Sequence, residues 1–184
     1  MRNTRAAIVI AALSIACSAL CAADVLDKDL KIGDTVYPKG TQVGYYKSGK
    51  LYWAQPKRPV TVNGLKAAAN YNIIFYPSGK LKQIRLATSA VIDGRKCAAN
   101  YLTELYESGK IAVCPLAEPT TIQGIKLNNR DFAIFSEDGR LAGMMIHQPV
   151  TIKGKKYMPN CEIYLDEKGD VKEVKKLADG VHYY

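Results

Sequence analysis

Short segments in which apolar and polar residues alternate occur along most of the chain. In residues 71–76 the apolar column is formed by Ile73 and Phe75. The same column in other copies contains Val43 and Tyr45, Ala133 and Phe135, and Ile163 and Leu165. A period of two is typical of β-strands with one buried face and does not fit a helix. The apolar residues of the return strand break this alternation once, which predicts a repeated β-bulge. They are Leu81, Ile84 and Leu86, and later Leu141, Met144 and Ile146.

These strand segments are separated by turn signals that recur at one fixed interval. One glycine series has a spacing of 30 residues and contains Gly49, Gly79, Gly109, Gly139 and Gly169. A second series falls 15 residues after its first four members and contains Gly64, Gly94, Gly124 and Gly154. Gly33 opens the second series one residue early, which predicts an extra residue near Asp34. Such periodicity is the signature of a stacked repeat protein, here with about five units.

The residues around these glycines predict specific turns. Residues 76–80, Tyr-Pro-Ser-Gly-Lys, favour a type I turn followed by a glycine bulge. The dipeptides Asn63-Gly64 and Asp93-Gly94 favour two-residue type I′ turns. A third position, which precedes the outgoing strand, favours left-handed backbone and therefore marks a corner. It is occupied by Gly40, Asn70, Asn100 and Asn160.

Together these patterns predict an all-β fold, an elongated array of repeated antiparallel β-hairpins in about five 30-residue units. A single unit is too small to fold alone, because the few apolar side chains that it buries do not offset the conformational entropy lost on ordering the unit. Stacking covers both ends of each small core. A closed or sandwiched meander of the same hairpins is the alternative.

The N-terminal segment has a different character. Arg2 and Arg5 precede an apolar run, and small residues precede Asp24, as in a secretory signal peptide. We therefore predict a signal peptide over residues 1–23, a repeat domain over residues 24–184, and a periplasmic or secreted protein. Residues 13–17 loosely resemble a bacterial lipoprotein box, so lipidation and membrane anchoring at Cys17 is the alternative.

The repeat domain contains an odd number of cysteines, Cys97, Cys114 and Cys161. The columns of Cys97 and Cys114 are apolar, so we interpret these cysteines as small core residues. A structural disulfide or a dimer-forming free thiol are the alternatives. No cysteine pair has zinc-ligand spacing, and we predict no metal and no cofactor.

The sequence offers little for catalysis. The two histidines, His147 and His182, lie in no recognisable motif, and the serines at turn positions are explained by turn geometry. We therefore predict no catalytic residues and no enzymatic activity. An envelope hydrolase with a site around His147 and a purely structural envelope protein are kept as alternatives.

Charge suggests the class of partner. The formal net charge is +9, and loss of Arg2 and Arg5 with the signal peptide leaves +7. A basic exported protein favours anionic lipids, acidic glycans or envelope proteins as partners, and its compartment argues against nucleic acid.

The repeat orders part of this charge beside a column of tyrosines. One cation follows each of four turn glycines, at Lys50, Lys80, Lys110 and Arg140, and a tyrosine precedes three of the turns, at Tyr46, Tyr76 and Tyr106. Opposite strands of a hairpin bring the two columns together, which suits binding of anionic sugars or headgroups. Simple stiffening of the hairpin edge is the alternative, because Ser136, Asp166 and Asp170 interrupt the columns.

The unit Ile74-Phe75-Tyr76-Pro77-Ser78-Gly79-Lys80-Leu81 resembles the aromatic and glycine hairpins of MORN repeats, especially divergent bacterial MORN-like proteins. The resemblance covers most of residues 31–174, although the unit here is lengthened by its second hairpin. It implies a β-hairpin array without catalytic residues, used for protein or lipid-headgroup contacts. The sequence as a whole predicts a binding or scaffolding module of the cell envelope.

Overall fold

A computed structural model describes residues 23–177, and all regular structure within them is β-strand. Eleven strands form one antiparallel sheet in the order β1-β4-β5-β8-β9-β12-β13-β16-β17-β20-β21. They are β1 (Asp24–Val25), β4 (Gln42–Tyr45), β5 (Leu51–Gln55), β8 (Ile73–Phe75), β9 (Leu81–Arg85), β12 (Leu102–Leu105), β13 (Ile111–Pro115), β16 (Phe132–Phe135), β17 (Leu141–Ile146), β20 (Cys161–Leu165) and β21 (Val171–Lys176). Apart from β1, the strands pair as consecutive hairpins, which we call the long hairpins.

Five short hairpins alternate with the long hairpins along the chain, and each is a separate two-stranded sheet. Their strands are β2 (Leu30–Ile32) and β3 (Thr35–Tyr37), β6 (Val60–Val62) and β7 (Leu65–Ala67), β10 (Ala90–Ile92) and β11 (Arg95–Cys97), β14 (Thr120–Ile122) and β15 (Ile125–Leu127), and β18 (Val150–Ile152) and β19 (Lys155–Tyr157). Side chains from the short hairpins and from the long sheet belong to one buried core. The short hairpins therefore form a second layer on one face of the sheet.

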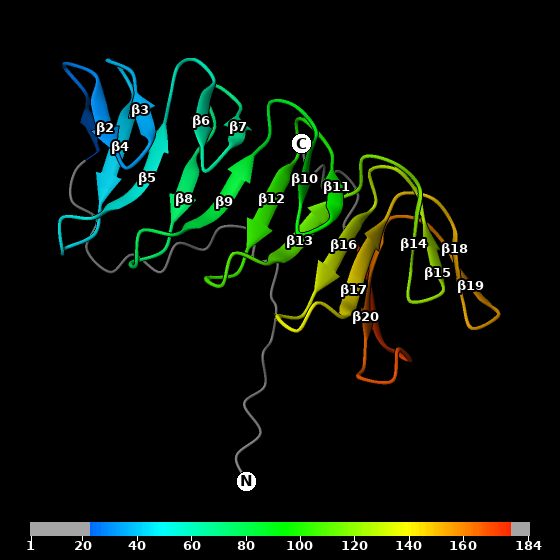
Figure 1. The fold of residues 1–184 in the computed structure, drawn as a ribbon. Coiled ribbons are helices and arrows are strands. Elements are labelled where there is room, and N and C mark those ends of the chain that lie inside the picture. Colours follow the sequence, from blue (N-terminus) through cyan, green and yellow to red (C-terminus); the bar gives the residue numbers. More distant parts are fainter. Residues whose placement is uncertain (1–22, 178–184) are drawn as a thin grey trace, which may run out of the picture.

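Each structural unit is a short hairpin followed by a long hairpin, and the units follow one another along a curved array (Figure 1). The five units span residues 30–55, 60–85, 90–115, 120–146 and 150–176. Neighbouring units are joined by the strand pairs β5–β8, β9–β12, β13–β16 and β17–β20. Because β1 and β21 lie at opposite ends of the strand order, the sheet is open, and the predicted hairpin array is confirmed over the closed alternative.

The predicted strand details are also present. Ile73 and Phe75 are buried in the core, as the alternation predicts. The register shifts once in every long hairpin, so the β-bulge recurs in all five units. In the second unit it lies between Ile74 and Phe75 on one strand, opposite Leu81 and Gln83 on the other.

The turns follow the glycine pattern, with one correction. Asn63 and Gly64 both have positive φ, 49° and 78°, as a type I′ turn requires. The predicted extra residue near Asp34 is wrong, because Ile32 pairs with Thr35 just as Val62 pairs with Leu65. Only the first of the two central residues, Gly33, has positive φ there, as in a type II′ turn, so its glycine comes one place earlier without an insertion.

The left-handed corner is present in all five units. Gly40, Asn70, Asn100 and Asn160 have positive φ as expected, and Arg130 completes the series with a φ of 69°. Arginine is a poor sequence signal for this conformation, which is why the pattern missed this corner.

The opposite face of the sheet is apolar near the C-terminal units. Val113, Phe132, Ile134 and Met145 are buried there in a second cluster, against which Leu177 packs. No helix in the described part of the chain could cross a membrane. The predicted signal peptide with Cys17 lies, but for its last residue, outside residues 23–177, as does His182.

Candidate functional site

The turns of the long hairpins lie along one edge of the array, at the lower side of Figure 1. Each turn is closed by two backbone bonds, such as Tyr76 N–H to the Lys80 carbonyl and Gly79 N–H to the Tyr76 carbonyl. The same pattern joins Tyr46 to Lys50, Tyr106 to Lys110 and Ser136 to Arg140. The expected pairing of the tyrosine and cation positions is therefore present, and we call this margin of the molecule the turn edge.

The tyrosine hydroxyls connect neighbouring units. Tyr46 donates to the Phe75 carbonyl at 2.6 Å, Tyr76 to the Leu105 carbonyl at 2.9 Å, and Tyr106 to the Phe135 carbonyl at 2.6 Å. In each case donor and acceptor are 29 residues apart, so every bond joins one unit to the next. Burial raises the pKa of all three phenols, with a further contribution from neighbouring charged groups.

These bonds give the three tyrosines a structural role that the sequence did not reveal. The fourth unit has Ser136 at the tyrosine position. There Arg140 connects the fourth unit to the fifth by donating to the Asp166 carbonyl at 3.0 Å. Lys110 likewise donates to the Glu137 carbonyl at 3.0 Å. Of the predicted binding residues, Tyr46, Tyr76, Tyr106, Lys110 and Arg140 thus make contacts between units.

Lys50 and Lys80 differ from the other two cations of the column. Within residues 23–177, no side chain or carbonyl bonds or pairs with either ammonium group, and both residues are exposed. Each lines a groove between its own unit and the next one. A cation at the mouth of a concave surface is a suitable contact for an anionic group.

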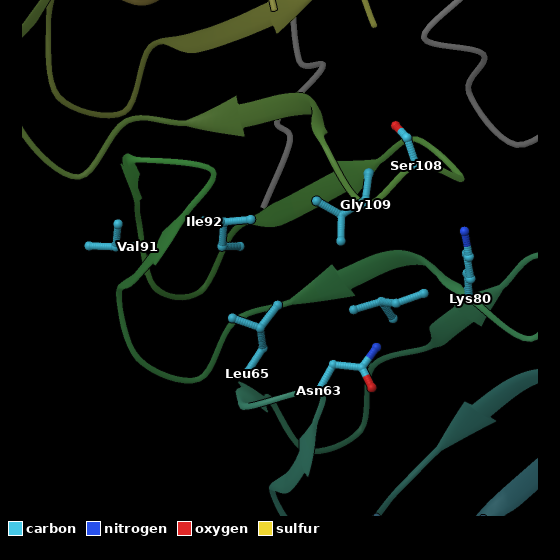
Figure 2. Close-up of a pocket in the computed structure, with 9 residues that line it drawn as sticks. Asn63, Leu65, Lys80, Val91, Ile92, Ser108 and Gly109 are labelled. Atoms are coloured by element: carbon cyan, nitrogen blue, oxygen red, sulfur yellow. The ribbon is translucent and has the colours of Figure 1, made fainter. Parts of the chain in front are cut away.

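The Lys80 groove lies between the second and third units and has a volume of about 380 Å³. Its apolar lining residues are Leu65, Leu81, Val91, Ile92 and Leu105. Figure 2 shows Lys80 and Ser108 on one side of the groove and Leu65, Val91 and Ile92 on the other, with Asn63 near Leu65. The groove thus offers an ammonium, an amide and a hydroxyl group above an apolar surface.

The Lys50 groove lies between the first and second units and has a volume of about 330 Å³. Its walls include Tyr37, Tyr45 and Phe75, and its polar groups include Asp34 and Asn63. Because Asn63 also lines the Lys80 groove, the two grooves are neighbours along the turn edge.

Between the third and fourth units, the side chain of Arg95 occupies the position that corresponds to the Lys80 groove. Arg95 reaches across, donates to the Gly139 carbonyl at 3.2 Å, and lies over the Phe135 ring at 4.2 Å from its centroid. Between the fourth and fifth units a groove of about 490 Å³ is present, lined by Arg140, Lys153, Lys168 and Glu167. Lys153 forms an ion pair with Asp170 there.

Charge changes steadily along the turn edge. The four-residue turns carry formal charges of +2, +1, 0, −1 and −1 from the first unit to the fifth. They are residues 47–50, 77–80, 107–110, 137–140 and 167–170. The cationic part of the edge is therefore its N-terminal end, where Lys50 and Lys80 lie.

A second row of cations was missed by the sequence reasoning. Lys66, Lys96, Lys126 and Lys156 occupy one position on the exposed side of the short hairpins. Their 30-residue spacing was the available signal. Lys96 forms an ion pair with Glu118 at 2.8 Å.

The histidine of the hydrolase alternative has an acidic neighbour. His147 Nδ1 lies 3.8 Å from the Asp131 carboxylate. Asp131 is fully buried, and its oxygens accept the backbone N–H groups of Asn128 and His147, both at 2.8 Å. This carboxylate therefore fixes the corner between two strands.

Cys97 and Cys114 are buried, as predicted for core residues, and Cys161 is buried as well. Within the described residues, no group of three or more His, Cys, Asp or Glu side chains could hold a metal ion. No protein-family model, characterised protein or solved structure matches the chain.

Proposed function

We propose that this protein is an exported, non-catalytic binding module of the cell envelope, and that it holds anionic glycans or lipid headgroups at the N-terminal half of its turn edge. The observation that carries the proposal is the position of Lys50 and Lys80. Each lies beside a groove of 330–380 Å³ and has no bonding partner within residues 23–177.

The groove chemistry supports an anionic, hydroxyl-rich ligand. A sugar presents an apolar ring face and polar hydroxyl groups, which match the apolar inner surface and the Asn63 and Ser108 side chains. The ammonium of Lys80 would pair with a carboxylate or phosphate on the same ligand. Volumes of this size are at the lower end for small-ligand sites, so each groove would take one or two residues of a longer polymer.

The cellular location rests on the N-terminal sequence and the general role on the resemblance to MORN-like repeats. A signal peptide over residues 1–23, or lipidation at Cys17, would place the array outside the cytoplasm. Headgroups and acidic polymers are abundant anions there. A scaffolding role toward an envelope protein is compatible with the same edge.

Charge reversal tests the proposal. The Lys50→Glu/Lys80→Glu variant should bind phosphatidylglycerol vesicles or an acidic polysaccharide at least about tenfold more weakly than the wild type. A suitable control is Lys66→Glu/Lys126→Glu, which makes the same change in net charge on the exposed side of the short hairpins. Circular dichroism spectra and melting temperatures close to those of the wild type would establish that both variants are folded.

Equal weakening by both variants would show that only net charge matters and would refute a site at the grooves. A loss confined to the control variant would move the binding surface to the short hairpins. If the wild type binds neither vesicles nor polysaccharide, a purely structural protein becomes the better description.

The hydrolase alternative has one supporting observation, the approach of His147 to Asp131. A hydrolytic role would require a measurable envelope-polymer cleavage that His147→Ala abolishes. The buried Asp131 carboxylate already accepts two backbone N–H groups, and for this reason we favour binding over catalysis.

A further inference from the structure

The third unit contains a pair of cysteines that face each other in the core. Cys97 lies at the end of β11 in the short hairpin, and Cys114 lies on β13 in the long sheet. Their Sγ atoms are 2.6 Å apart, and both residues are fully buried. Nonbonded heavy atoms normally approach only to about 3.5–4.0 Å, whereas a disulfide has an S–S length of roughly 2.05 Å.

Backbone contacts hold the two cysteines in this position. Cys97 forms an isolated antiparallel bridge with Leu116. Ala98 N–H donates to the Pro115 carbonyl at 2.8 Å, and Ala117 N–H donates to the Lys96 carbonyl at 3.0 Å. The two sulfur atoms thus face each other because these backbone bonds attach the short hairpin to the sheet.

The repeat shows that cysteine at both positions is particular to this unit. The equivalent pair is Tyr37 and Ala54 in the first unit, Ala67 and Ile84 in the second, and Leu127 and Met144 in the fourth. All six side chains are buried in the same core. Ordinary apolar residues therefore pack at this position in the other units, and core packing alone does not require two cysteines.

We propose that Cys97 and Cys114 form a disulfide bond that ties the third short hairpin to the long sheet. The oxidant is a disulfide of the thiol-exchange class, such as glutathione disulfide or an oxidised dithiol protein. One cysteine thiolate attacks it to form a mixed disulfide and release one thiol. The second cysteine then attacks the mixed disulfide and releases the other thiol. The two cysteines are thereby oxidised to a disulfide, and the reagent disulfide is reduced to two thiols.

The third cysteine is excluded from this bond by the topology. Cys161 lies on β20, which is separated from β13 by two strands of the sheet. Three inter-strand steps amount to about 14 Å, whereas bridged Cα atoms are no more than roughly 7 Å apart. Cys97 and Cys114 are both fully buried in the folded chain, so the bond, once formed, is shielded from attack by outside thiols.

Peptide mapping tests the proposal directly. The reduced, unfolded full chain is refolded in a glutathione redox buffer, acid-quenched, alkylated and digested with trypsin. We expect the peptide of residues 97–110 linked to that of residues 111–126, and separation of the two on reduction. Recovery of both peptides alkylated would overturn the bond, as would linkage of either one to a peptide that carries Cys17, Cys21 or Cys161.

Thermal melting tests the structural role of the bond. The loop between the two cysteines is short, and reduction should lower the melting temperature of the refolded wild type by roughly 5–10 °C. Cys97→Ala/Cys114→Ile reproduces the pair of the second unit and should not respond to reductant, whereas Cys161→Ala should respond like the wild type. A wild-type melting temperature that is the same with and without reductant would refute the tie between the two layers.

Discussion

The hydroxyl of Tyr76 donates a hydrogen bond to the backbone carbonyl of Leu105, 29 residues further along the chain. This bond joins the second unit to the third, beside the strand pair β9–β12 that already connects them. The phenol is half-buried, so it contributes to stability while its ring still borders the turn edge.

Removal of that hydroxyl should weaken the array. Tyr76→Phe keeps the ring and leaves the Leu105 carbonyl without this donor, which should cost about 0.5–1.5 kcal/mol of unfolding free energy in urea titrations. Tyr71→Phe is a suitable control, because Tyr71 is exposed at 46% and its ring contact with Arg85 survives the change. A Tyr76→Phe chain as stable as the control would mean that the inter-unit bond adds nothing.

Thr103→Val should stabilise the protein. Thr103 is fully buried, and its hydroxyl has no hydrogen-bond partner within the described residues. The equivalent positions hold the apolar residues Val43, Ile73, Ala133 and Ile163. Since an unsatisfied buried hydroxyl costs roughly 1 kcal/mol or more, valine should raise the melting temperature by about 2–4 °C. The exposed substitution Thr121→Val should leave it unchanged, and a fall for Thr103→Val would contradict this interpretation.

Gly44→Ala should displace the single tryptophan. Trp53 pairs with Gly44 across the first long hairpin, and a β-carbon on Gly44 would lie 2.2 Å from the indole Nε1. The clash should cost about 1–3 kcal/mol and change the tryptophan emission spectrum, which reports on this unit alone. An unchanged spectrum with wild-type stability would show that the ring has room to move.

Glu104 should make stability depend on pH. Burial raises the pKa of Glu104, against a smaller opposing effect of Lys82. The folded state therefore holds the proton more tightly than the unfolded chain, and stability declines as the pH rises from the ordinary carboxyl pKa through the folded value. Glu104→Gln should remove this decline, so its gain over the wild type in urea unfolding should be larger at pH 7 than at pH 4. Glu167→Gln, on an exposed turn, is the matched control, and the same pH trend in both variants would refute the role of burial.

Much of the fold could be predicted from the sequence because its determinants are local. The turn type at Asn63-Gly64 and the corner at Asn70 follow from backbone preferences of single residues. The buried column of Ile73 and Phe75 follows from alternation within one strand. The early position of Gly33 wrongly predicted an insertion, because two turn types can close hairpins of equal length with glycine at different places.

Most features that the sequence did not predict depend on contacts between units. A column of tyrosines in an alignment does not show that the Tyr76 hydroxyl reaches a carbonyl of the next unit. Nor does the sequence show that Arg95 fills one groove while Lys80 borders an open one. The row that begins at Lys66 recurs every 30 residues and was therefore predictable from the sequence.

Under the proposed function, the open strand order sets the spacing of the contacts that the array makes with its ligand. Each unit adds two strands to the sheet, at about 4.8 Å per strand, so equivalent side chains recur about every 10 Å. Lys50 and Lys80 would then contact charges at that separation on a linear polymer, and the second contact would form at high effective concentration once the first is made. A chain with one more unit would measure a longer stretch of the same polymer without any change in its interior packing.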